Sequence, residues 1–262
     1  MLRARIIPCL LVHNKGLVKT ANFGSPKYVG DPINAVRIFN EKEVDELTVL
    51  DIDASADKRE PDYGMIRNLA AECRMPLCYG GGVTKTEQAV RIINMGVEKV
   101  SLSAAAIERP ALVDEMARFV GNQSVVVTLD VKRDQKSGAY QVWTHNATRN
   151  TKRDPAELAR EFEQRGAGEV TINSIDNDGV MKGYDMDLAR RVRAAVTVPL
   201  TILGGAGSLK DVENLVKEFG IVGACAGSLF VFKGVYKAVL INYPDRAQKK
   251  ALCAGALSGA AA

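Results

Sequence analysis

The sequence has few of the residues on which metal and nucleophilic chemistry usually depend. Its two histidines, His13 and His145, are too few for a histidine-rich metal site and give little support to a Ser-His-Asp triad. None of its glycine-rich turns fits G-x-G-x-x-G followed by an acidic residue about twenty positions later. The sequence therefore predicts no bound metal and no nucleotide redox cofactor.

Cysteine pairs and long apolar runs are also lacking. The five cysteines form no C-x-x-C pair, which favours reduced, mostly buried thiols in a cytosolic protein. No apolar run reaches membrane-spanning length, and no signal-peptide pattern follows Met1. We therefore expect a cytoplasmic protein that does not enter a membrane.

Charge of one sign is not concentrated anywhere in the chain. The 35 lysines and arginines stand against 31 acidic residues, and the net charge of +4 is spread along the sequence. This balance argues against a nucleic-acid partner but leaves phosphorylated small molecules open. The hydrophobic content of 47% is ample for a large core.

What the sequence does have is a regular alternation of short apolar runs and amphipathic segments. The run Ser124–Val131 (SVVVTLDV) is rich in β-branched residues and shows no polar alternation, as expected of a strand buried on both faces. Such strands are predicted to start near Arg5, Glu46, Pro76, Glu98, Ser124, Glu169, Pro199 and Gly220. The helices predicted between them are Pro32–Glu43, Asp62–Cys73, Lys85–Met95, Pro110–Phe119, Pro155–Arg165, Asp187–Ala195, Leu209–Phe219 and Leu229–Tyr236. This pattern predicts an α/β fold, a (β/α)8 TIM barrel.

The pattern repeats at about half the chain length. Gly80–Val83 after the third strand corresponds to Gly204–Gly207 after the seventh, and Ser103-Ala104 corresponds to Gly227-Ser228. Two glycine-rich turns in equivalent places give the barrel mouth two sites where backbone N–H groups can approach a phosphate. The alternative is a pair of tight turns that bind no ligand.

The repeat suggests how the chain is divided. We expect one barrel over residues 1–245, with half-barrels of about 1–122 and 123–245. Residues 246–262 end in an Ala- and Gly-rich stretch and are predicted to be a frayed or marginally helical tail without function.

Two long stretches lack a clear pattern of their own. The first, His13–Gly30, is predicted to be an irregular lid over the mouth. The second, Lys132–Asp154, contains Tyr140–Thr144, which we expect to form a small hairpin with Trp143 as its apolar anchor.

The fifth predicted strand ends on a carboxylate where the first does not. Asp130 closes the run Ser124–Val131, and parallel α/β folds keep their chemistry at this end of their strands. The equivalent position in the first half of the chain is Leu11.

These motifs together are similar to those of a known family. From Met1 to about Tyr236 the chain resembles the cyclase subunit of imidazole glycerol phosphate synthase, the barrel partner of a glutamine amidotransferase. The resemblance depends on RIIPCL, GDP, LDIDAS, GGGV, GAGE, SIDNDG, GYD and GGAG, which begin at residues 5, 30, 50, 80, 166, 174, 183 and 204. It implies that ammonia made by a glutaminase enters the bottom of the barrel. The ammonia then attacks a substrate with a phosphate at each end, held across the top, without a cofactor.

The resemblance also implies roles for individual residues. Asp130 matches one of the two aspartates of the family that do acid–base chemistry. The residues that match positions binding the substrate or its phosphates are Lys19, Asp51, Gly81, Gly82, Ser103, Asp176, Asp178, Gly179, Gly204, Gly205, Gly227 and Ser228.

Four charged residues stand at the starts of predicted strands. Arg5, Glu46, Lys99 and Glu169 match the gate through which ammonia enters in the family. A ring of alternating charges compensates itself, so ions can occupy a narrow, partly desolvated mouth. The alternative is a set of ordinary salt bridges at strand starts that only stabilise the fold.

Three departures from the family concern the top of the barrel. Leu11 stands where the second catalytic aspartate is expected, and a leucine cannot transfer a proton. The loop Ser103-Ala104 replaces Asn and Thr side chains that help to hold one phosphate, and Asn173 replaces a threonine. One catalytic carboxylate is missing and one phosphate site is weakened, whereas the gate is complete.

The favoured hypothesis is therefore a relative that has kept the ammonia route and lost ring closure. Such paralogues pair with a glutaminase and supply ammonia to a separate sugar amidotransferase in surface-polysaccharide biosynthesis. The second hypothesis is a working cyclase of histidine biosynthesis, in which Asp51 or Asp176 substitutes for the missing aspartate. The third is a scaffold that activates a glutaminase by docking. A sugar-phosphate isomerase on the same fold is disfavoured, because it too uses two aspartates.

Overall fold

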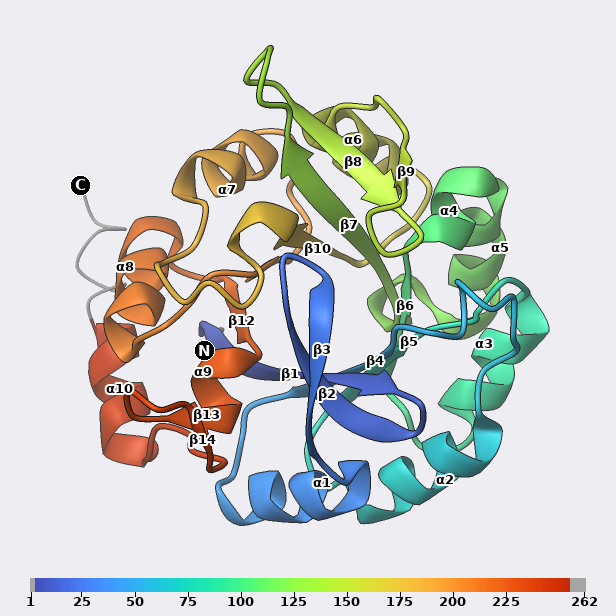
Figure 1. Ribbon diagram of the computed structural model, residues 1–262. Coiled ribbons are helices and arrows are strands. Elements are labelled where there is room, and N and C mark those ends of the chain that lie inside the picture. Colours follow the sequence, from blue (N-terminus) through green and yellow to red (C-terminus); the bar gives the residue numbers. More distant parts are fainter. Residues whose placement is uncertain (1–2, 255–262) are drawn as a thin grey trace.

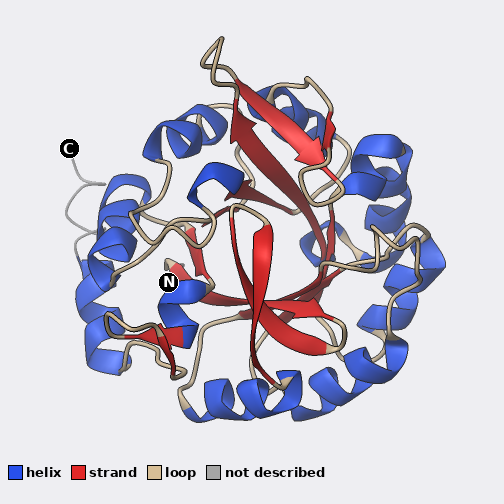
Figure 2. Ribbon diagram, viewed as in Figure 1, coloured by secondary structure: helices blue, strands red, loops and turns tan. Residues whose placement is uncertain are grey.

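A closed barrel of parallel strands forms the centre of the computed structural model, which describes residues 3–254. Within that range, eight strands pair side by side in the order β1, β4, β5, β6, β7, β10, β11 and β12, and β12 pairs again with β1. Figure 2 shows the strands inside a ring of helices. Their bounds are β1 Arg5–His13, β4 Leu47–Asp51, β5 Leu77–Gly80, β6 Lys99–Leu102, β7 Val125–Arg133, β10 Glu169–Ser174, β11 Leu200–Leu203 and β12 Gly223–Ala226. The (β/α)8 TIM barrel is confirmed, and each strand starts within about three residues of its expected position.

Several helices begin directly after a side chain that caps them. The Asp31 side chain accepts a hydrogen bond from Asn34 N at the start of α1, and Asp154 accepts two at the start of α6. The helices are α1 Pro32–Glu41, α2 Tyr63–Glu72, α3 Thr86–Ile93, α4 Ala104–Glu108, α5 Ala111–Val120, α6 Pro155–Gln164, α7 Met186–Arg193, α8 Leu209–Phe219, α9 Ser228–Val231 and α10 Arg246–Ala254. Two single 3₁₀ turns, η1 Asn122–Ser124 and η2 Ile175–Asn177, complete the set within the described range. None of the helices in residues 3–254 is both long and apolar enough to cross a membrane.

The eighth position in the ring of helices differs from the expectation. The segment predicted as helix Leu229–Tyr236 contains only the short α9, followed by the two-stranded β13 Phe232–Lys233 and β14 Ala238–Val239. Figure 1 shows α10 between α8 and α1, where the eighth helix of a barrel belongs. Residues 246–254 thus pack as part of the ring and not as a frayed tail, while residues 255–262 lie outside the described part.

Helix α10 is fixed to the start of the barrel by buried contacts. Lys249 Nζ donates to Glu43 O at 2.8 Å and lies 3.0 Å from Asp45 Oδ1. Leu252 is 8% exposed and belongs to the main core. The sequence prediction missed this packing because the Ala- and Gly-rich end of the chain dominated the composition of the tail.

The two long connections cover the mouth with hairpins. The stretch predicted as an irregular lid forms β2 Gly16–Ala21 and β3 Gly24–Gly30, which pair with each other, while β2 also pairs with β1. Figure 1 shows this hairpin lying across the end of the barrel. The second hairpin is confirmed as β8 Tyr140–Thr144 on β7, extended by β9 Arg149–Asn150. Its buried anchor is Val142, however, since Trp143 is only half-buried.

Candidate functional site

A cavity opens at the carboxyl ends of the strands, beneath the two hairpins. The predicted residues that line it are Leu11, Lys19, Asp51, Gly81, Gly82, Ser103, Asp130, Asp178, Gly179, Gly204, Gly205, Gly227 and Ser228. Asp176 is the exception: it is exposed, and its Oδ2 accepts a hydrogen bond from Arg133 N at 2.8 Å outside the cavity lining. The structure thus brings together all but one of the residues predicted for the mouth.

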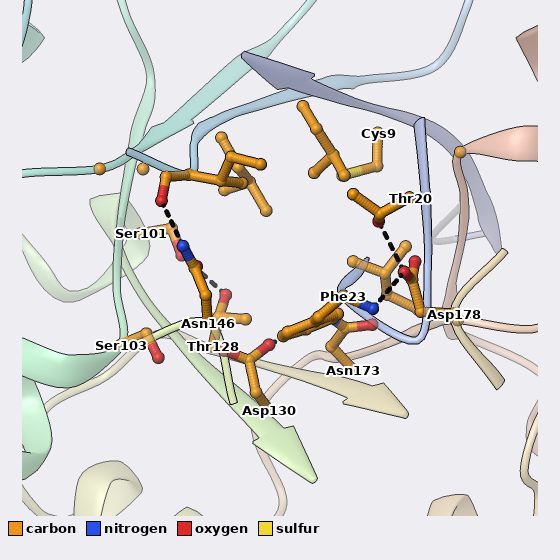
Figure 3. A pocket seen from close by; sticks show the side chains of 18 of the residues that line it. Cys9, Thr20, Phe23, Ser101, Ser103, Thr128, Asp130, Asn146, Asn173 and Asp178 are labelled. Carbon is orange, nitrogen blue, oxygen red and sulfur yellow. Dashed lines mark hydrogen bonds between the residues drawn. The ribbon is translucent and has the colours of Figure 1, made fainter. Parts of the chain in front are cut away.

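Asp130 is the carboxylate at the centre of one wall. It lies on β7 beside Asn173 of β10, whose Nδ2 donates to Asp130 Oδ1 at 2.9 Å (Figure 3). Burial raises the pKa of Asp130 to about 7, the nearby Asp178 adds to the rise, and the hydrogen bond from Asn173 opposes it. A carboxyl group with a pKa near neutrality can both accept and release a proton under physiological conditions.

Leu11 gives the wall on the first strand a different character. In the closed strand order, β1 lies on the far side of the barrel from β7. Leu11 packs against a small apolar cluster inside the barrel, made of Ile7, Cys9, Leu203 and Cys225. The side chain opposite Asp130 on β1 therefore cannot exchange a proton.

The β2–β3 hairpin contributes a buried lysine to the mouth. Lys19 is 5% exposed, and its Nζ donates to Cys9 O at 2.6 Å. Burial lowers the pKa of this amine, although the nearby Cys9 and Asp178 oppose the shift. A Cβ atom placed on Gly227 would lie only 2.7 Å from Lys19 Nζ, so the lysine reaches the turn predicted to bind phosphate.

Asp178 ties the same hairpin to the opposite rim. Its Oδ2 accepts a hydrogen bond from Thr20 Oγ1 at 2.6 Å and from Phe23 N at 3.2 Å (Figure 3). Burial raises the pKa of Asp178 despite these donors. The hairpin is therefore held over the cavity by a carboxylate that is itself partly desolvated.

The two glycine-rich turns have a steric requirement for glycine. Gly81 has φ +127°, and a Cβ atom there would lie 2.5 Å from Asp51 O. Gly205 has φ +110°, and a Cβ atom there would lie 2.1 Å from Gly183 O. Glycine is required at both positions by the close approach of backbone, whether or not the turns also bind an anion.

Asp51 organises the first of these turns. Its Oδ1 accepts hydrogen bonds from Asp53 N at 3.0 Å and from Ala54 N at 3.1 Å. Burial raises the pKa of Asp51, although these N–H donors and Arg59 oppose the rise. The cavity thus contains three partly desolvated carboxyl groups, with Asp51 on a different wall from Asp130.

Three further residues of the cavity were not among the predicted site residues. Phe23 comes from the β2–β3 turn, while His145 and Asn146 come from the turn between β8 and β9. Asn146 Nδ2 donates to Ile52 O at 2.8 Å, which joins the second hairpin to the rim beside Asp51 (Figure 3). Both hairpins were recognised as long connections, but no local pattern indicated which side chains they direct inward.

The four charged residues predicted as a gate form a closed ring at the other end of the barrel. Arg5 is paired with Glu46 and lies 2.9 Å from Glu169 Oε1, and Lys99 Nζ lies 2.9 Å from Glu46 Oε1 and 2.8 Å from Glu169 Oε2. Burial favours the neutral form of Glu169, but Arg5 and Lys99 outweigh it and lower the pKa of this carboxyl. Each charge is thereby balanced by two of opposite sign.

A small cavity lies between the ring and the mouth. Hydroxyl groups line part of it, and Ser101 Oγ is 2.7 Å from Thr128 Oγ1. Four residues line both this inner cavity and the mouth: Leu50, Ser101, Thr128 and Leu203. The two cavities are therefore neighbours along the barrel axis. Across residues 3–254 no cluster of three or more His, Cys, Asp or Glu side chains is arranged to hold a metal ion.

Comparison with known proteins places this architecture in a family. The model of the family described as "Histidine biosynthesis protein" matches residues 5–237. A Leptospira interrogans protein, provisionally named as subunit HisF of imidazole glycerol phosphate synthase, is 56% identical over 252 residues, which cover 96% of this chain and 99% of the relative. A similarly named "hisF2" protein of Pseudomonas aeruginosa is 51% identical over 94% of this chain and 97% of its own.

A more distant relative carries the same name without qualification. "Imidazole glycerol phosphate synthase subunit HisF" of Petrotoga mobilis is 37% identical over 238 residues, covering 91% of this chain and 94% of its own. Each of these matches covers more than nine tenths of both chains. The chain therefore belongs to the histidine biosynthesis protein family and, within it, is a HisF-like barrel subunit.

Proposed function

We propose that this barrel receives ammonia from a glutaminase subunit and passes it along its axis to a separate acceptor enzyme. The acceptor is a sugar amidotransferase of surface-polysaccharide biosynthesis, and ring closure at the mouth is impaired. The observation that carries the proposal is the contrast between the two ends of the barrel. The charged ring is complete at the lower end, whereas Leu11 leaves Asp130 without a partner at the upper end.

The lower end is suited to a HisH-like glutaminase. Relatives are named as subunits of a synthase, which implies an assembly with a second chain. Arg5 and Lys99 are half-buried, while Glu46 and Glu169 are buried, so the ring closes the barrel and still reaches its surface. A partner that displaces one ion pair can open a path inward without leaving a charge uncompensated.

The interior is suited to a small neutral molecule. Thr171 and Thr201 join the Ser101 and Thr128 hydroxyls around the inner cavity, and Cys78 and Cys225 line other parts of it. Both glutamates of the charged ring also line the cavity, but each is already paired with two cations. Hydroxyl groups can donate to and accept from ammonia, and the apolar side chains of the lining disfavour ions. Ammonia is therefore a better cargo than ammonium for this segment.

The upper end of the barrel is better suited to releasing ammonia than to closing an imidazole ring. A positioned acid or base contributes typically about 10²–10⁴ in rate, and Leu11 supplies neither function. Ala104 also lacks a hydroxyl at the loop where the resemblance leads us to expect a phosphate contact. A phosphorylated small molecule can still bind at the turn formed by Gly227 and Ser228, close to Lys19.

The proposal is tested by tracing the amide nitrogen of glutamine into the product of the acceptor enzyme. The barrel is purified with its glutaminase, given glutamine labelled with ¹⁵N in the amide group, and assayed with and without the candidate acceptor enzyme and its nucleotide-linked sugar. We expect ¹⁵N in the sugar product only when the barrel is present, even when unlabelled ammonium is added as a competitor. Equal labelling without the barrel would contradict transfer through it. Faster glutamine hydrolysis with no nitrogen transfer would instead support a docking scaffold.

A second candidate function is a working cyclase of the imidazole glycerol phosphate synthase type. Asp51 and Asp178 favour it, because both carboxyl groups line the mouth and burial raises the pKa of each. Either could carry out the acid–base step assigned by resemblance to the missing aspartate. Turnover of the bis-phosphorylated imidazole precursor with an ammonium salt and no glutaminase separates this function from the first.

A further inference from the structure

The side chain of Asn173 keeps one buried polar atom without a partner. The residue is 6% exposed, and its Nδ2 donates to Asp130 Oδ1 at 2.9 Å. Among residues 3–254, no group donates a hydrogen bond to its Oδ1 atom. Buried acceptors are nearly always satisfied, so this carbonyl oxygen indicates a donor that arrives from elsewhere.

The orientation of the amide follows from its neighbour. In the structure the NH₂ group of Asn173 faces Asp130 Oδ1 and the carbonyl oxygen turns away, an arrangement that suits an ionised Asp130 because a carboxylate only accepts hydrogen bonds. A Cβ atom on Gly204 would lie 3.1 Å from this oxygen, which places the oxygen beside the glycine-rich turn. Asn173 and Asp130 both line the mouth cavity (Figure 3).

The position of Asn173 continues the barrel passage. Along β10, Glu169 belongs to the charged ring, Thr171 lines the inner cavity and Asn173 lines the mouth. Side chains two residues apart on a strand point to the same side. One row of inward side chains therefore extends from the ring to the mouth, and the unpaired carbonyl lies at its upper end.

The surroundings select the kind of donor. A carboxylate and a carbonyl on neighbouring strands offer acceptors, and Leu203, which lines the same cavity on the next strand, offers none. Magnesium and calcium ions need six or more oxygen ligands, whereas ammonium presents four N–H donors and is satisfied by fewer acceptors. A small donor with several N–H groups is therefore the best match.

We propose that Asn173 Oδ1 and the Asp130 carboxylate form an ammonium-binding station at the upper end of the barrel passage. This inference rests on the proposed ammonia route. Ammonia arriving through the inner cavity takes the proton of a neutral Asp130, which leaves a carboxylate paired with ammonium. When the acceptor draws the nitrogen away, the proton returns to Asp130 and neutral ammonia leaves. No other reactant is consumed.

The charges around the station agree with a bound cation. The other titratable groups that line the same mouth are Cys9, Lys19, Asp51, His145 and Asp178. Burial places the pKa of Asp130 at about 7, so the carboxyl can release a proton to ammonia near neutral pH. Lys19 Nζ already donates a hydrogen bond to Cys9 O on β1. The lysine therefore does not compete with a second cation for the carboxylate of Asp130.

The test uses the isolated full-length barrel and ammonium chloride as the probe. The carboxyl carbons of its aspartates are labelled with ¹³C, and the Asp130 signal is assigned by its loss in Asp130→Asn. The protein is titrated with acid and base in ammonium chloride and in tetramethylammonium chloride of equal concentration, because the second cation has no N–H donor. At an ammonium concentration about ten times its Kd, the apparent pKa of Asp130 should fall by about one unit.

Two variants locate the effect. Asn173→Leu removes the carbonyl oxygen and should abolish the difference between the two salts. Asn177→Ala is the control. Asn177 is an amide of the same rim, its Nδ2 donates to Gly183 O at 3.3 Å, and it does not line the cavity. This variant should keep the difference between the two salts. Identical titration of Asp130 in both salts in the unmodified protein would overturn the station, as would a difference that survives Asn173→Leu.

The result is separable from the proposed function. A barrel that delivers labelled nitrogen to its acceptor but shows no ammonium effect on Asp130 overturns the station alone. A barrel that shows the ammonium effect but delivers no nitrogen supports the station and overturns the transfer role.

Discussion

Lys99 and Glu169 meet across the lower end of the barrel, with Lys99 Nζ 2.8 Å from Glu169 Oε2. Lys99 also lies 2.9 Å from Glu46, and Arg5 contacts both glutamates from the other side. Neither glutamate has more than a few per cent of its surface exposed, so each depends on both cations. This dependence makes the ring testable by removing one charge.

Lys99→Met should destabilise the protein strongly, because two buried carboxylates are left with Arg5 alone. Breaking a buried ion pair in this way costs typically about 3–5 kcal/mol. Urea unfolding followed by circular dichroism measures the loss. The control is Arg109→Met, whose ion pair with Glu115 is exposed and should be worth less than about 1 kcal/mol. Similar losses in the two variants would show that the ring is not a buried network.

Asp130→Asn should stabilise the protein increasingly as the pH rises. Burial raises the pKa of Asp130 in the folded state to about 7 from its ordinary value of 3.8, so the folded state holds the proton more tightly than the unfolded chain. Stability from this group is present at acid pH and is lost as the pH rises between those two values, by roughly 1 kcal/mol per pH unit. The free energy of unfolding of the unmodified protein and of Asp130→Asn, measured across this pH range, gives the difference.

Asp134→Asn is the control of opposite sign. The N–H of Ser137 and its hydroxyl hold the pKa of Asp134 below the usual value, so this carboxylate contributes stability at neutral pH that is lost in acid. Its removal should lower stability more at neutral than at acid pH. If the stability of the Asp130 and Asp134 variants changed with pH in the same direction, the burial of Asp130 would not explain the pH dependence of its variant.

Lys19→Met should weaken the binding of phosphate at the mouth. Lys19 Nζ reaches the turn at Gly227, and a cation at that position adds to the attraction of the backbone N–H groups for an anion. Thermal unfolding with and without inorganic phosphate measures the binding, and the rise in Tm should be smaller in the variant. Lys27→Met on the same hairpin is the control, because Lys27 is exposed and lies over the Phe232 ring. An unchanged rise in Lys19→Met would place the anion elsewhere.

Leu252→Ala should show that α10 belongs to the barrel. Truncating a buried leucine costs typically about 2–5 kcal/mol, and Leu252 is 8% exposed within the main core. Leu240→Ala is the control, because Leu240 is 52% exposed and its loss should change stability by less than about 0.5 kcal/mol. Chemical denaturation measures both. Equal, small effects would support the alternative of a marginal tail.

Features with a strong local pattern could be predicted from the sequence. Ser124–Val131 has the uninterrupted apolar character of a strand covered on both faces, and the structure has β7 there. The helices predicted to start at Pro32 and Pro155 do start there, each capped by the aspartate before it. The residues of the mouth could be predicted because the carboxyl ends of all the barrel strands lie at the same end of the barrel.

Features that depend on distant contacts could not be predicted in this way. Helix α10 is fixed by Glu43 and Asp45, which lie about two hundred residues earlier, and a composition rich in alanine and glycine concealed it. Asp176 shares a motif with Asp178, yet the turn η2 directs one carboxylate to Arg133 N and the other into the mouth. The unpaired oxygen of Asn173 is visible only when every donor around it is placed.

The measurement that tests the account most directly is the rate at which the barrel turns over the bis-phosphorylated imidazole precursor with ammonium chloride. The unmodified protein should show little or no turnover, because Leu11 cannot transfer a proton, and Leu11→Asp should raise the rate at least about tenfold. Leu11→Asn is the matched control, since it is polar but cannot act as an acid or base. Rapid imidazole formation by the unmodified protein would contradict the account.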